Sequence, residues 1–387
     1  MLDPTRPYRR AAGRHTGRGQ RQRAAACWAV LAVLTLAPPV RAAEVQRARW
    51  LMGTLWSAAA PCAPADSTRC GAALDAALDS VAALDRLLSN WAPASALSRL
   101  NAAGAGEALS EPLYAVIDSA LALAALTDGA FDPTVEPLTT AWDLRGKGRV
   151  PGERELATAC ARTGWARVVL DRDARRVQLN GARLDLGGIA KGFALDRAAA
   201  VLAARGIRAA TLDAGGQRLV LGMPETVWVA MPLQRDAPAV RVTLAEASLS
   251  TSAQSERFVT TRGRRYGHVL DPHTGRPVES RASVSVRAAS ATRADALSTA
   301  LLVLGRERAR TFADAHPELG VLWLEPQQRL VQAHAWNMSI IARAAGVELT
   351  KPGEQEHIAP ARTRPVSDKA VLTLPSSAAS AHTPNHP

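Results

Sequence analysis

The stretch that most constrains the fold of this chain runs from Asp185 to Asp196 and reads Asp-Leu-Gly-Gly-Ile-Ala-Lys-Gly-Phe-Ala-Leu-Asp. It follows a segment of alternating apolar residues (177–184) and leads into an alanine-rich helical run. Glycines let backbone N–H groups approach phosphate oxygens, a helix N-terminus carries partial positive charge, and Lys191 adds a full one. The stretch therefore predicts a strand, a tight turn and a helix suited to an anionic ligand. Its spacing fits neither the dinucleotide fingerprint nor the Walker loop, and plain strand-to-helix packing is the alternative interpretation.

The N-terminus has the order of an export signal. Residues 1–42 contain eight Arg and one Asp, an apolar run follows at residues 24–36, and small residues end it at Ala42 and Ala43. We therefore predict a signal peptide over residues 1–43 and an exported protein, in the periplasm or on the periplasmic face of the inner membrane. The apolar run is short for a membrane span, but an uncleaved leader that associates with the membrane is the alternative.

The charge outside the leader is modest. Residues 1–42 carry a net +7 of the chain's +12, which leaves +5 for the remainder. No stripe of Lys and Arg with interleaved aromatic residues follows, so the composition argues against a nucleic-acid partner. An apolar content of 47% supports a sizeable core, and the mixed periodicity predicts one α+β domain without repeats over residues 44–345. Residues 346–387 lack periodicity, are rich in Pro, Ser, Ala and Thr, and are predicted to be disordered.

Apolar residues that recur with the helical period predict helices in this domain, and apolar residues that alternate with polar ones predict strands. The expected helices are 71–90, 112–127, 194–205, 292–304 and 306–315. The expected strands are 45–60, 166–171, 176–180, 209–213, 218–222, 226–231, 239–244, 256–261, 282–288 and a final one at 319–324.

Three cysteines lie beyond the leader. Cys62 and Cys70 flank a segment that could form a hairpin tip, and an exported context would let them pair. Cys160 lies in a helical pattern and is interpreted as a buried small hydrophobe rather than a nucleophile. No Cys/His spacing typical of a metal site is present.

Two further segments carry candidate chemistry. Asp295, Ser298 and Thr299 lie at i, i+3 and i+4 of a helical pattern, so their oxygens share one face. Such oxygens suit a hard cation such as Mg²⁺, whereas a helix-capping region with a solvated Asp is the alternative. His268 alternates with apolar neighbours in a strand that ends in a turn, where a lone His is more often a structural residue.

Taken in order, these pieces resemble one family, the FAD:protein FMN transferases of the ApbE type. The matching motifs span about residues 48 to 325. They are Met52-Gly53-Thr54, Leu97 to Asn101, Gly129 to Thr134, Asp185 to Gly192, Asp213 to Gly216, Thr251-Ser252 with Glu256-Arg257, His268 to Pro277, and Ala294 to Leu301.

The resemblance implies a single two-lobed α+β domain with a flavin cleft and a Mg²⁺-dependent reaction. FAD would be cleaved at its pyrophosphate, FMN would pass through its phosphate to a Thr or Ser of a target redox protein, and AMP would leave. The resemblance also implies roles for individual residues. Asp295, Thr299 and Ser298 would hold the metal with the Gly188 carbonyl, His268 would be the general base, and the FAD site would include Met52, Trp91, Ala130, Phe131, Asp132, Lys191 and the backbone of Val269.

The chain departs from the family pattern at two positions. Gln217 stands where the family usually has Asp, and Ala253-Gln254 stands where it usually has Gly-Asp. Each change replaces a carboxylate with a neutral amide. Two alternatives therefore stay open: a flavin-binding protein without transferase activity, and an FAD pyrophosphatase in which water attacks.

Overall fold

The computed structural model describes residues 43–350 apart from 107, 255–257 and 262–263. Residues 1–42 of the predicted signal peptide, the Glu256-Arg257 motif and residues 351–387 of the predicted tail lie outside the described residues. Among the helices that are described, none combines the length and the apolarity needed to cross a membrane.

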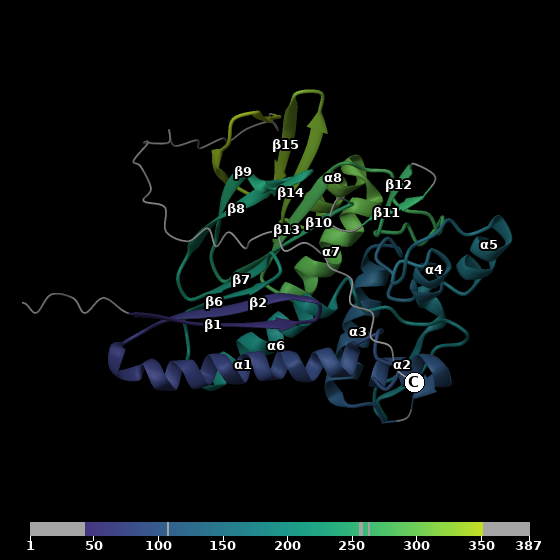
Figure 1. The fold of residues 1–387 in the computed structure, drawn as a ribbon, viewed down its shortest axis with the longest axis horizontal. Helices are drawn as coiled ribbons and strands as arrows, with labels where there is room; N and C mark the ends of the chain where they lie inside the picture. The colour runs from purple at the N-terminus through teal and green to yellow at the C-terminus, as the bar shows by residue number, and fades with distance from the viewer. Residues whose placement is uncertain (1–42, 107, 255–257, 262–263, 351–387) are drawn as a thin grey trace, which may run out of the picture. The chain divides into compact units, whose positions relative to one another are not determined.

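The element order mixes strands and helices throughout, as an α+β fold requires (Figure 1). The strands are β1 (Ala43–Leu51), β2 (Thr54–Cys62), β3 (Ala105–Gly106), β4 (Val169–Asp171), β5 (Arg176–Gln178), β6 (Ala210–Ala214), β7 (Gln217–Leu221), β8 (Glu225–Met231), β9 (Gln234–Leu244), β10 (Ala247–Ala253), β11 (Phe258–Thr261), β12 (Arg264–Gly267), β13 (Ser283–Ala288), β14 (Gly320–Gln327), β15 (Leu330–Trp336), β16 (Ile340–Arg343) and β17 (Val347–Leu349). The helices are α1 (Ser67–Leu88), α2 (Ala96–Ala103), α3 (Glu111–Leu126), α4 (Glu136–Ala141), α5 (Glu153–Ala161), α6 (Ala190–Ala204), α7 (Ala291–Leu304) and α8 (Arg306–Ala315), with short 3₁₀ turns η1 (Pro64–Asp66) and η2 (Trp165–Arg167).

The largest sheet has nine strands in the order β1-β2-β6-β7-β10-β13-β14-β15-β17. Its neighbours pair antiparallel except β15 and β17, which are parallel. The strand expected at 45–60 is in fact a hairpin, because Met52 and Gly53 both have positive φ angles (49° and 72°) and turn the chain. Two consecutive residues with positive φ form the tight turn that matches strand twist.

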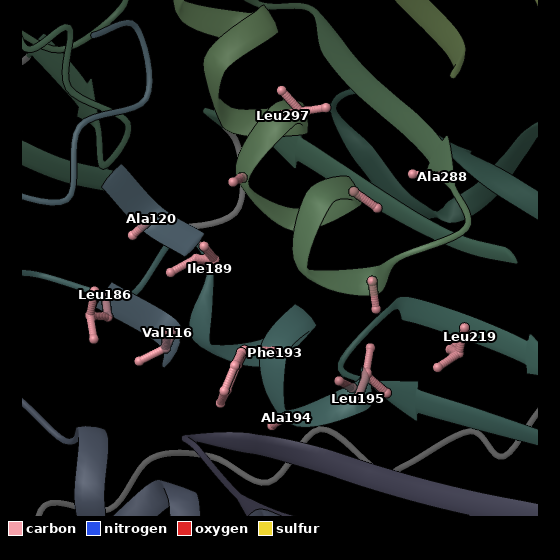
Figure 2. Close-up of a cluster of buried hydrophobic side chains, with 14 of the residues drawn as sticks. Val116, Ala120, Leu186, Ile189, Phe193, Ala194, Leu195, Leu219, Ala288 and Leu297 are labelled. Carbon is pink, nitrogen blue, oxygen red and sulfur yellow. The ribbon is translucent and has the colours of Figure 1, made fainter. Parts of the chain in front are cut away.

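Both faces of the central strands of this sheet are covered. Helices α1, α6 and α7 pack on one face, and the three-stranded sheet β16-β9-β8 packs on the other. Figure 2 shows the helical side, where Val116 of α3, Phe193 of α6 and Leu297 of α7 surround one apolar cluster. Because the central strands are buried on both sides, residues 320–324 of β14 are all buried and read as a continuous apolar run.

The contact between α6 and α7 is fixed by two residues of α6. A Cβ on Gly192 would lie 2.2 Å from the Ala291 carbonyl oxygen, so only glycine permits this approach. The Asp196 carboxylate accepts hydrogen bonds from the backbone N–H groups of Ala291 and Thr292, at 2.8 and 2.9 Å. It therefore caps α7 from a neighbouring helix.

Several sequence expectations are corrected. Strand β14 is not the final strand, since β15, β16 and β17 follow it. Strand β17 pairs with β15, so the folded part extends beyond the expected boundary at residue 345. Helix α6 begins at Ala190 rather than 194, and α2, α4 and β10 were not anticipated. Short helices and polar-rich strands such as β10 (Ala-Ser-Leu-Ser-Thr-Ser-Ala) carry little periodic signal.

Cys62 and Cys70 form a disulfide, with Cα atoms 6.6 Å apart. The segment between them is not a hairpin tip, because it contains η1 and the start of α1. The bond thus joins the end of β2 to the first turn of α1. Cys160 is a partly buried free thiol on α5 and packs beside Gly275, as a small apolar side chain would.

Candidate functional site

A cavity of about 810 Å³ lies where several loops and helix ends meet the β6–β7 turn and β10 of the large sheet. Its size is within the range of small-molecule and cofactor sites. The walls come from the β1–β2 turn, the end of α1, the loop at residues 130–135, the start of α6, the β6–β7 turn, β10, residues 268–272 and α7. Segments more than 200 residues apart in sequence therefore share one site.

Nearly all the residues expected from the sequence line this cavity. They are Met52, Trp91, Ala130, Phe131, Asp132, Gly188, Lys191, His268, Val269, Asp295 and Thr299. Ser298 does not line it: the residue is completely buried, and its hydroxyl donates to the carbonyl oxygen of Asp295 at 2.9 Å. Of the two hydroxyls expected at the site, that of Ser298 therefore faces β10 and only that of Thr299 lines the cavity.

Asp295 is buried, with only 4% of its surface exposed, and its carboxylate has defined partners. Oδ2 accepts the Gly192 N–H at 3.0 Å, and Oδ1 lies 3.5 Å from Lys191 Nζ and 3.4 Å from Ser250 Oγ. The capping interpretation of Asp295 is wrong, because Ser290 and Asp196 cap α7 instead. A buried carboxylate at a cavity wall can bind a cation or a donor group.

Hydroxyl oxygens gather next to this carboxylate. Ser252 Oγ lies 2.8 Å from Ser298 Oγ and 3.2 Å from Thr299 Oγ1. Gly188 is close by, since a Cβ built on it would be 3.7 Å from Thr299 Oγ1. Across the described residues, no group of three or more His, Cys, Asp or Glu side chains could hold a metal. Any metal at this cavity must therefore rely on few carboxylates and several neutral oxygens.

The start of α6 is positively charged. Lys191 lies in its first turn, where the helix dipole adds to the ammonium charge. Just before it, Asp185 Oδ1 accepts the Gly187 N–H at 2.9 Å and Oδ2 accepts a 2.5 Å bond from Arg145 Nη2. Asp185 thus shapes the Gly-Gly turn and holds Arg145 at the cavity wall.

Asp132 holds the loop that bears Phe131. Its carboxylate accepts the Thr134 N–H and hydroxyl, at 2.7 and 2.6 Å, and the Trp165 N–H at 2.9 Å. Burial raises the pKa of Asp132, although these hydrogen bonds act in the opposite direction. The Asp-Pro-Thr motif is therefore a clamp between two loops at the cavity.

Met52 is presented by a constrained turn. A bulky side chain at positive φ is uncommon, and the Met52 N–H is held by the Asp85 carboxylate of α1 at 2.8 Å. Trp91 follows the end of the same helix and is 64% exposed. Helix α1 thus positions two expected cofactor contacts at once.

Gln254 stands where the family usually has Asp, and it takes a structural role in this chain. Its amide oxygen accepts the Val269 N–H at 2.9 Å, and its Nε2 donates to the carbonyls of Val269 and Val278 at 2.7 and 2.8 Å. A Cβ on Gly267 would lie 1.9 Å from the Gln254 oxygen, so glycine is needed there. A carboxylate could not supply the two donated bonds. Gln254 therefore fixes the backbone that carries His268.

Gln217 is buried at the β6–β7 turn and lines the cavity. Its Nε2 donates to the Ala291 carbonyl at 2.9 Å, while its amide oxygen has no hydrogen-bond partner among the described residues. The turn itself needs Gly215, because a Cβ there would lie 2.2 Å from Thr54 Oγ1.

Three charged residues of the cavity were missed from the sequence: Asp85, Arg145 and Arg235. Asp85 is hidden within the apolar periodicity of α1, and Arg145 and Arg235 lie in segments without a local motif. Only the fold brings them to the cavity.

Comparison with known proteins gives the family. The ApbE family model matches residues 52–323, most of the chain. The chain belongs to the ApbE family. A protein named FAD:protein FMN transferase from Treponema pallidum (strain Nichols) is 33% identical over 320 residues, which cover 75% of this chain and 87% of that protein.

Solved structures agree with this ApbE membership. The ApbE protein of Thermotoga maritima has a TM-score of 0.67 at 30% identity and covers 78% of this chain and 97% of that one. The flavin transferase ApbE from Vibrio cholerae has a TM-score of 0.65 at 28% identity, over 76% and 97%. The predicted α+β ApbE-like fold is thereby confirmed.

Proposed function

We propose that this ApbE-family chain is an FAD:protein FMN transferase. The observation that carries the proposal is the joint placement of a buried carboxylate, a lysine at a helix start and a histidine on one large cavity. Relatives of the same fold are named for this activity. FAD would be the small-molecule substrate, and a protein hydroxyl would be the acceptor.

The reaction we propose is a displacement at phosphorus. The oxygen of an acceptor Thr or Ser forms a bond to the FMN phosphorus, and the bond to the bridging oxygen breaks with its electron pair leaving on AMP. His268 accepts the hydroxyl proton as general base. Lys191 and the N-terminus of α6 neutralise phosphate charge, since phosphoryl transfer depends mainly on positioning and electrostatics.

We propose that Mg²⁺ assists this reaction. The oxygens at the site fit it: Mg²⁺ in phosphate chemistry uses one or two carboxylates together with substrate phosphates. Asp295, Thr299 and the Gly188 carbonyl would hold the ion, and the buried Ser298 would support Thr299 through Ser252. Bound there, Mg²⁺ would supply charge neutralisation at the pyrophosphate.

The test is product analysis. The purified mature protein is incubated with FAD, Mg²⁺ and each candidate exported redox subunit in its flavin-free form. Flavin fluorescence that stays on the subunit after denaturation, with AMP released, supports transfer. Free FMN and AMP in place of bound flavin indicate a pyrophosphatase, and unchanged FAD indicates a binding protein. EDTA should abolish transfer and weaken FAD binding, whereas equal FAD affinity with and without EDTA would contradict the metal assignment.

We also propose that the protein acts outside the cytoplasm, either released or held at the membrane by an uncleaved leader. Two features support this: the basic, apolar and small-residue order of the leader, and the Cys62–Cys70 disulfide, a bond that persists in oxidising compartments. Sequencing the N-terminus of the protein from membrane and periplasmic fractions distinguishes the two forms.

A further inference from the structure

A second cavity, of about 390 Å³, adjoins the first. Gly216, Thr251 and Arg235 line both cavities, so the two meet at the β6–β7 turn and the middle of β10. One wall of the smaller cavity is formed by residues 227–231 of β8, and the opposite wall by the face of the large sheet. We call this smaller cavity the β8 groove.

Strand β8 presents an unpaired edge to this groove. It is the terminal strand of the sheet β16-β9-β8, and no other strand in the described part of the chain pairs with its outer side. An exposed strand edge carries backbone N–H and C=O groups that an extended polypeptide can pair with. The register with β9 shifts between Val229 and Met231, so residues 225–229 are the regular part of this edge.

The side chains of the β8 groove also suit a polypeptide. Val227, Val229 and Leu249 line the groove but are themselves buried in the core between the two sheets, whereas the Trp228 side chain is 47% exposed. On the sheet side, Arg218 pairs with Asp213 at 3.4 Å. Ser283 is 2% exposed, and its hydroxyl has no hydrogen-bond partner among the described residues. A buried hydroxyl without a partner is costly, and a peptide backbone in the groove would supply one.

We propose that the β8 groove binds an extended segment of the acceptor protein as an added strand along β8. This inference rests on the proposed function, which requires a protein hydroxyl to reach the interior of the FAD cavity. A segment lying along β8 would deliver its Thr or Ser past Gly216 and Thr251, where the two cavities meet.

The probe is a display library of random twelve-residue peptides with one central Thr or Ser, selected on the FAD-loaded full chain. Selected peptides should slow backbone hydrogen exchange in β8. Ala230→Trp, which fills the groove, should weaken their binding by about tenfold or more. Thr226→Trp, on the same strand but outside both cavities, is the matched control and should bind normally. FAD affinity and thermal melting of both variants should equal those of the wild type.

The outcomes test peptide binding along β8 separately from the transfer of FMN. Peptide binding along β8 is contradicted if the selected peptides leave the hydrogen exchange of β8 unchanged, or if they bind Ala230→Trp as tightly as the wild type. A selection that yields no binder also contradicts it. Should Ala230→Trp fail to fold, the hydrogen-exchange map of the wild type still decides. Peptides that protect β8 but receive no flavin support the groove and contradict the transfer reaction. Flavin transfer to peptides that leave β8 unprotected contradicts the groove alone.

Discussion

His268 shares the cavity wall with Val269, and its imidazole is the proposed general base. We expect His268→Ala to lower the single-turnover rate of FMN transfer by roughly 10²–10⁴-fold, the usual contribution of positioned proton transfer. FAD affinity should change little, because the base meets the acceptor hydroxyl rather than FAD. The wild-type rate should increase with pH, since only neutral imidazole accepts a proton. A loss of thermal stability that accounts for the whole loss of rate would identify His268 as structural.

Gln254 acts on the same segment through its three hydrogen bonds to Val269 and Val278. Gln254→Glu should lower the free energy of unfolding by about 1–3 kcal/mol for each carbonyl left without a donor. Urea denaturation measures this, and Gln178→Glu on the exposed side of β5 is the control. The defect should lessen in acid, where a protonated Glu regains one donor. If Gln254→Glu had the same free energy of unfolding as the wild type at neutral pH, the three hydrogen bonds would make no net contribution to stability.

At the scale of elements, β15 and β17 are joined through His334. Thr350 Oγ1 donates to the Ala333 carbonyl at 3.0 Å, so His334 Nδ1, 2.8 Å away, must donate to the Thr350 oxygen. His334 Nε2 is then unprotonated, and it is buried without a hydrogen-bond partner among the described residues. Burial lowers the pKa of His334, with Arg306 acting in the same direction. The native state of this pair of strands therefore favours a neutral imidazole.

The pH dependence follows from this direction. The unfolded chain binds a proton at the ordinary histidine pKa of about 6.5, whereas the folded chain resists it to lower pH. The contribution of neutral His334 to the free energy of unfolding is therefore complete above the pKa of the unfolded chain. It is lost as the pH falls through and below that value. We expect His334→Gln to be less sensitive to acid than the wild type between about pH 7 and 5, in urea melts. His316→Gln, at a partly exposed histidine beside Glu318, is the control. An identical acid loss in His334→Gln and wild type would contradict the assignment.

At the scale of the whole folded part, α1 links the disulfide to the cavity. Cys70 lies in its first turn and Asp85 near its end, about 22 Å apart at 1.5 Å per residue. Closing so short a loop between Cys62 and Cys70 should stabilise the fold by roughly 2–3 kcal/mol. We expect the Cys62→Ala, Cys70→Ala double variant to lose about this much stability in denaturant. Its FAD affinity in native buffer should be unchanged, because the bond lies far from Asp85.

Cys160→Ala is the matched control for this prediction, since Cys160 is a free thiol on α5. Reductant should destabilise Cys160→Ala as it does the wild type, and should leave the double variant unaffected. Equal stability of the wild type and the double variant would show that α1 is held by packing alone.

Much of the site was predictable because its residues lie in local motifs. The Gly-Gly turn before α6, the Asp295–Thr299 face of α7 and the His268 strand end all act through spacing of a few residues, which the sequence displays directly. Helices α1, α3 and α8 were predictable for the same reason, because one buried face repeats with the helical period. Helix α7 was also expected, although most of its residues are buried. Short irregular elements and the turn at Met52 were not, since positive φ at a methionine leaves no compositional signal.

The sequence by itself determined the family, the α+β class and the side chains able to bind a ligand or to react, because these depend on the local order of residues along the chain. Only the tertiary structure decided which of them share a cavity. In the tertiary structure, Ser298 is buried against β10, and Asp132 and Gln254 each join two segments by hydrogen bonds. The fold also places Asp85, Arg145 and Arg235 at the cavity. The physical reason is that packing and long-range hydrogen bonds select one contact for each polar side chain, and nothing in local periodicity encodes a partner a hundred residues away.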